Sequence, residues 1–134
     1  LQLSTLSHVV RVPVELSLFY LFQYGMVPEL MTFEGRNFDI LAGITAPLMA
    51  WLYTQNKITN QVLLSWNFIC LGLVLFILIN GILSAELPFQ QFGFDQPNKA
   101  LEYPPFVLLP ALIVPVVVYT HIIDIIKLIR LIKK

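Results

Sequence analysis

The stretch from Ile58 to Ala85 constrains this fold more than any other feature of the chain, because it contains no charged residue. Its centre, residues 71–79, is almost entirely apolar. About 20 apolar residues, each rising about 1.5 Å along a helix, cross the roughly 30 Å of lipid tails in a bilayer. A soluble chain of 134 residues could not cover such a helix on every side. We therefore expect a membrane protein.

The composition supports this expectation. Hydrophobic residues make up 57% of the chain and charged residues only 12%, whereas about 25% of an ordinary soluble domain is charged. The length allows one small bundle, so we expect a single domain over residues 1–134. The formal net charge of zero offers no basic groove for a nucleic acid. Cys70, the single cysteine, cannot form an intrachain disulfide, and we expect it to be a small core residue.

Three other segments are apolar enough to cross a bilayer, so the predicted fold is an all-α bundle of four transmembrane helices, kinked at internal prolines. The expected spans are residues 3–24, 39–55, 61–85 and 105–131, and the loops 25–38 and 86–104 lie on the outer side. The second span is the shortest, with about 17 uncharged residues between Asp39 and Lys57. A re-entrant segment is the alternative at this position.

The second span also carries a stripe of small residues. Ala42, Ala46 and Ala50 recur every four residues and therefore share one face of a helix. Small side chains let two helices approach closely in a membrane, where no hydrophobic force drives helices together. We expect these alanines to form a helix–helix contact.

Basic residues gather toward one side of the predicted bundle. That side holds Lys57, Lys127, Arg130, Lys133 and Lys134. The other side holds Arg36 and Lys99 among several acidic residues. Because basic residues in short loops stay in the cytoplasm, we expect both termini to be cytoplasmic and the two long loops to lie outside.

Ionisable side chains interrupt the apolar runs of the first and last spans. A charge at the bilayer centre costs about 2.5–3.5 kcal/mol, so these side chains should face the bundle interior. We expect one buried polar cluster, formed by His8, Arg11, Glu15, Asn67, His121 and Asp124. Within it, Arg11 should pair with Asp124 of the last helix. Glu15, one helical turn from Arg11, is the alternative partner.

Three interpretations of this cluster remain open: a structural network, a proton or ion pathway, and a metal site. His8, His121 and Asp124 could supply metal ligands, but the HExxH and clustered-histidine spacings are absent, so we predict no metal site. The sequence identifies no cofactor. It also has no GxSxG-like turn, and we predict no catalytic residue.

The outer loops supply a second set of candidates. Glu34, Arg36, Asp39 and Asp95 could bind a ligand there. The alternative is a purely local role, in which residues 34–37 form a tight turn and Asn37 or Asp39 caps the next helix. The segment lacks the glycines and the Lys-Ser/Thr end of a phosphate-binding loop.

The segments SHVVRVPVE, MTFEGRNFDILAGITAPLMAWL and QQFGFDQPN resemble a group of small multi-pass bacterial membrane proteins without an assigned function. This resemblance implies a bacterial inner membrane and carries over no catalytic residue.

Two functional hypotheses follow. The first is a non-enzymatic accessory or scaffold subunit of a larger membrane assembly, whose partners are the lipid bilayer and other membrane protein subunits. The second is a transporter, a proton or ion conduit, or a metal-dependent membrane enzyme that uses the polar cluster.

Overall fold

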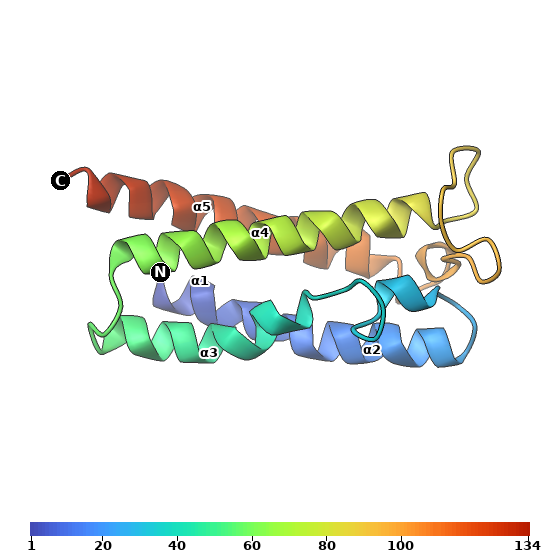
Figure 1. Ribbon diagram of the computed structural model, residues 1–134, viewed down its shortest axis with the longest axis horizontal. Coiled ribbons are helices and arrows are strands. Elements are labelled where there is room, and N and C mark those ends of the chain that lie inside the picture. Colours follow the sequence, from blue (N-terminus) through green and yellow to red (C-terminus); the bar gives the residue numbers. More distant parts are fainter.

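The chain folds into an elongated helical bundle, which confirms the all-α prediction; the computed structural model describes residues 1–134. The elements are α1 (Gln2–Ser7), η1 (His8–Val10), α2 (Arg11–Gln23), η2 (Glu29–Met31), α3 (Ile40–Thr54), α4 (Asn60–Leu83), η3 (Ala100–Glu102), η4 (Leu109–Ile113) and α5 (Val114–Ile132). Figure 1 shows both termini and the α3–α4 connection at one end of the bundle, and the two long connections at the other.

The elements α1, η1 and α2 together form one first helix, which is locally distorted next to a proline. Pro13 has no N–H group, so the carbonyl of Val9 loses its helical hydrogen bond, and the turn just before it tightens into the 3-10 geometry of η1. The start of the last helix shows a related effect. The π-helical turn η4 contains Pro110 and is followed by Pro115, and here the N–H of Val114 donates to the carbonyl of Leu109.

Two helices are long and apolar enough to cross a membrane. α4 has 24 residues, and its most apolar 18-residue stretch has a mean hydropathy of 2.6; the continuous segment Leu109–Ile132 also has 24 residues, and its most apolar 18-residue stretch has a mean hydropathy of 2.1. α3, with 15 residues, is apolar but shorter. The first helix is divided by η1 and carries several polar side chains.

α3 lies against the first helix through small residues. Ala42, Ala46 and Ala50 are all buried, and α3 contacts α1, η1 and α2. At Gly43, next to Ala42, an added Cβ would lie 2.9 Å from Cγ2 of Val12. The buried alanines and Gly43 therefore allow these two helices to lie close together.

α3 begins beside the middle of the first helix, and the chain between them folds back into the bundle. Val27, Met31, Thr32 and Asn37 of this connection are buried, and Ser84 Oγ at the end of α4 donates to Sδ of Met31 at 3.6 Å. In Figure 1 the connection runs back along α2 before α3 starts. The segment expected to be an outer loop thus fills the space beside α2 that a longer α3 would occupy.

The interior has two parts of different chemistry. Near the end with the long connections, an apolar cluster is formed by Leu18, Leu21, Val27, Met31, Ile77 and Ala100. Toward the end with the two termini, the space between the first helix, α3, α4 and α5 is filled by polar side chains. The second part contains the candidate site.

Candidate functional site

A row of buried polar side chains follows the inner face of the first helix. Thr5, His8, Arg11 and Glu15 are 1, 0, 2 and 1% exposed. Their spacing of three or four residues places them on one face, and the row extends about 15 Å at a rise of about 1.5 Å per residue. The sequence identified all of these except Thr5, although its position one turn before His8 was a usable signal.

Arg11 makes the central contacts of the site. Its Nη1 donates to Oδ1 of Asp39 at 2.9 Å and to the carbonyl oxygen of Cys70 at 3.4 Å. Its Nη2 donates to Nε2 of His121 at 2.8 Å. Arg11 therefore joins the first helix to α3, α4 and α5.

The predicted ion pair between Arg11 and Asp124 is wrong. Asp39, at the start of α3, forms the ion pair with the Arg11 guanidinium. Oδ2 of Asp124 instead accepts a hydrogen bond from Ser4 Oγ at 2.6 Å. Glu15, the alternative partner, also forms no ion pair with Arg11. The sequence placed Asp39 in an outer loop, whereas α3 begins deep in the bundle and buries that carboxyl group.

The hydrogen bonds of His121 define its protonation state. An arginine side chain can only donate, so Nε2 of His121 must accept from Arg11. The proton of the neutral ring is then on Nδ1, which donates to Oδ1 of Asn67 at 2.7 Å. Asn67 in turn donates to the carbonyl of Leu63 at 3.0 Å. Every polar atom of the His121 ring is thus used.

His8 is packed but has no hydrogen bond. Its ring stacks on that of His121, with centroids 3.9 Å apart and 8° between the ring planes. Trp66 packs against it edge-on, with a centroid separation of 5.8 Å. Neither ring nitrogen of His8 has a partner, although the residue is completely buried.

The three metal-ligand candidates do not form a metal site. His8 and His121 stack with nearly parallel planes, so their nitrogen lone pairs do not converge on one point. Arg11 already occupies Nε2 of His121. No group of three or more His, Cys, Asp and Glu side chains in the structure is arranged to hold a metal ion.

Glu15 is held by Asn37, which the sequence marked only as a turn or helix-capping residue. Asn37 Nδ2 donates to Oε2 of Glu15 and to the carbonyl of Met31 at 3.0 Å. Its Oδ1 accepts a hydrogen bond from the backbone N–H of Asp39, two residues later, at 3.0 Å. This contact forms an Asx-turn. Asn37 therefore positions both carboxyl groups near Arg11.

Six buried side-chain atoms lack a hydrogen-bond partner. They are Oγ1 of Thr5, Nδ1 and Nε2 of His8, Nε of Arg11, Oδ1 of Asp124 and Oδ1 of Asn98. Unpaired buried polar atoms are uncommon in native proteins. Five of the six belong to the polar row on the first helix or to Asp124 of α5. The side-chain atoms that are free to form a hydrogen bond are therefore gathered along the inner face of the first helix.

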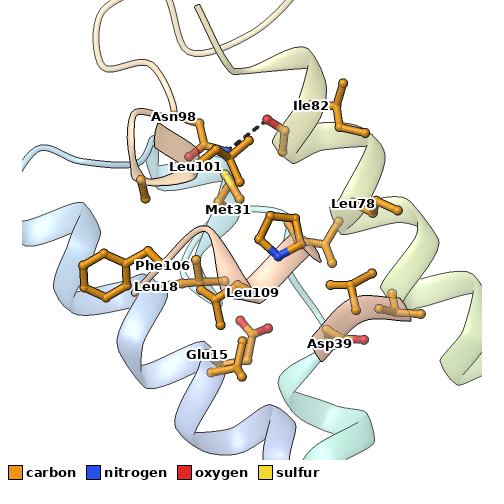
Figure 2. A pocket seen from close by; sticks show the side chains of 17 residues that line it. Glu15, Leu18, Met31, Asp39, Leu78, Ile82, Asn98, Leu101, Phe106 and Leu109 are labelled. Atoms are coloured by element: carbon orange, nitrogen blue, oxygen red, sulfur yellow. Dashed lines mark hydrogen bonds between the residues drawn. The ribbon is translucent and has the colours of Figure 1, made fainter. Parts of the chain in front are cut away.

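A cavity of about 90 Å³ adjoins the other end of this row. Glu15 and Asp39 lie at one end of it and Asn98 at the other (Figure 2), and its walls come from α2, α4 and the segment from Phe106 to Val114. The polar row thus opens into a space between the helices.

The remaining outer-loop candidates lie apart from this site. Glu34, Arg36 and Asp95 are exposed, and the guanidinium of Arg36 lies 4.8 Å from the centre of the Phe92 ring. Arg36 and Asp95 border the same surface depression, without an ion pair between them. The structure does not bring them together with Asp39.

Comparison with known proteins adds a family but no function. No curated protein and no solved structure matches the chain. One family model matches residues 3–129, which includes the whole polar row and nearly all of α5. The chain therefore belongs to the family described as Domain of unknown function (DUF8737).

Proposed function

We propose that the chain is a multi-pass protein of a bacterial inner membrane, with four spans and both termini in the cytoplasm. The outward faces of the helices are apolar; Leu3 is 82% and Ile69 65% exposed, while charged side chains are buried inside. This inverted distribution suits lipid as the solvent. The basic residues of the α3–α4 turn and of the α5 end support the orientation, because they share one end of the bundle.

Within that membrane, we propose that the polar row is a proton pathway. One observation carries this proposal: three buried carboxyl groups, those of Glu15, Asp39 and Asp124, accompany a single buried guanidinium, that of Arg11. Four fixed charges would sum to −2 in a bundle interior where an unbalanced charge is costly. The cluster must therefore hold protons or another cation.

The unpaired atoms give a route for protons. On the cytoplasmic side, Oδ1 of Asp124, Oγ1 of Thr5 and the nitrogens of His8 are free to bind a proton or a water molecule. On the outer side, Glu15 borders the cavity that extends to Asn98. Arg11 lies between the two halves, and its contact with Asp39 offsets the positive charge that would otherwise repel protons.

Proton flux into liposomes tests this proposal. The purified chain would be reconstituted with an internal pH-sensitive dye, a pH gradient would be imposed, and charge movement would be balanced with potassium and valinomycin. We expect the liposome interior to acidify faster than that of empty liposomes, as reported by the dye. Glu15→Gln should lower this rate at least tenfold, because the amide cannot carry the proton.

The matched control is Lys127→Gln, which removes a charge from an exposed site on α5 and should leave the flux unchanged. Flux equal to that of empty liposomes would refute the proposed pathway. Unchanged flux in a folded Glu15→Gln protein would show that protons do not pass through the polar row.

A second candidate function is that of an accessory subunit. Large apolar side chains are exposed on the connection between α4 and η3, beyond the ends of the helices; Phe89 is 53% and Phe94 70% exposed. Such side chains suit the headgroup layer or a partner subunit. If they contact a partner, Phe89→Ser with Phe94→Ser should reduce the size of the native complex in mild detergent. Tyr24→Ser, at an exposed site on the other long connection, is the control.

A further inference from the structure

The cavity between α2, α4 and the start of the last helix is not explained by a proton pathway alone. Most of its wall is apolar: 12 of its 17 lining residues are hydrophobic. Figure 2 shows Leu109 and Leu78 among these, with polar groups confined to the two ends. A buried water molecule needs two to four polar partners, so the two polar ends of the cavity suit water, whereas its apolar middle also suits a ligand with an apolar chain.

When Glu15 and Asp39 are ionised, the free hydrogen-bonding atoms of the cavity are mostly acceptors. Oε1 of Glu15 and Oδ2 of Asp39 take part in no hydrogen bond, because Asn37 and Arg11 use the other oxygen of each carboxyl group. At the far end, Asn98 is 2% exposed and its Oδ1 has no partner. One N–H of its Nδ2 donates to the carbonyl of Gly81 at 3.1 Å. With both carboxyl groups ionised, the cavity presents free oxygen acceptors on Glu15, Asp39 and Asn98, against the second N–H of Asn98 as a side-chain donor.

We propose that this cavity binds a small primary ammonium compound with a short apolar chain. The ammonium group supplies three donors and a positive charge, which matches the free oxygens of Glu15 and Asp39 and offsets part of the net negative charge of the interior. The alkyl chain lies along the apolar wall toward Asn98. A donor group at the far end of the ligand would satisfy Oδ1 of Asn98.

The volume limits the ligand to a few heavy atoms. The cavity measures about 90 Å³, whereas an apolar cavity of about 150 Å³ holds benzene. A bare metal ion does not fit this arrangement, because it requires several oxygens around one point. Here the carboxyl groups lie at one end of the cavity and Asn98 at the other (Figure 2).

Binding of n-butylammonium to the full chain in lipid nanodiscs tests the proposal, with calorimetry as the readout. We expect saturable binding, and at least tenfold weaker binding of n-butanol, which has the same chain length without the charge. Glu15→Gln should weaken n-butylammonium binding at least tenfold. Val74→Phe should abolish it by filling the cavity, and this variant tests the site even if Glu15→Gln does not fold.

Asp124→Asn is the matched control, because it alters a buried carboxyl group outside the cavity. It should reduce proton flux and leave n-butylammonium binding unchanged, so the two proposals can fail separately. The ligand proposal is overturned if n-butylammonium does not bind saturably, if n-butanol binds equally well, or if Val74→Phe binds like the parent.

Discussion

The imidazole rings of His8 and His121 lie face to face, 3.9 Å apart, and only one of them is hydrogen-bonded. Two positively charged rings could not stack at this distance without strong repulsion. The contact therefore requires at least one neutral ring, and the donor-only character of Arg11 assigns that state to His121. His8 lies in η1, near the start of the chain, and His121 lies in α5, near its end; the neighbouring α1 contacts α5.

The first prediction concerns the tautomer of His121. Nitrogen-15 NMR of the protein in nanodiscs should show the proton on Nδ1, because Nε2 accepts from Arg11 and Nδ1 donates to Asn67. Asn67→Leu removes the acceptor for Nδ1 and should change the Nδ1 chemical shift. A proton on Nε2 in the parent protein would contradict the hydrogen-bond arrangement described here.

The second prediction separates the two possible partners of Arg11. Asp39→Leu strands the guanidinium and should lower the free energy of unfolding by about 3–5 kcal/mol, while the double variant with Arg11→Leu should recover most of this loss. Asp124→Leu removes only the bond from Ser4 and should cost about 1 kcal/mol. Reversible unfolding in mixed micelles measures all three. If Arg11→Leu instead rescued Asp124→Leu, Arg11 would pair with Asp124 and not with Asp39.

A third prediction addresses the close packing of α3. Ala46 is completely buried, so Ala46→Leu should overpack the contact with the first helix and cost about 1–3 kcal/mol. Ile44→Leu on the exposed face of the same helix is the control and should change stability by less than about 0.5 kcal/mol. Equal free energies of unfolding for the two variants would mean that the alanine face does not form a tight contact.

The fourth prediction concerns orientation. In a Cys70→Ala background, single cysteines at positions 36 and 133 should react with an impermeant maleimide from opposite sides of the membrane. Arg36 contacts Phe92 on the long connection after α4, whereas position 133 follows the end of α5. We expect position 36 to be labelled from outside intact cells and position 133 only after permeabilisation. Labelling of both from one side would rule out the proposed topology.

Local chemistry was enough to locate the helices and their polar faces. A charge-free run of suitable length predicts a long apolar helix wherever it occurs, and α4 forms there. Likewise, the spacing of His8, Arg11 and Glu15 puts them on one helical face whatever the helix packs against, and all three are buried. These properties depend on residues close together in the chain, so the sequence alone contains them.

The partners of these side chains depended on the tertiary structure. Asp39 reaches Arg11 because the connection after α2 folds back into the bundle and starts α3 beside the middle of the first helix. Asn98, more than 80 residues after Glu15 in the chain, reaches the same cavity only once α4 and its following connection are in place. Helix formation follows a local periodicity, whereas the depth at which each helix begins is set by packing between distant segments. The sequence therefore determined an all-α chain with a polar face, and the tertiary structure decided which charges meet there.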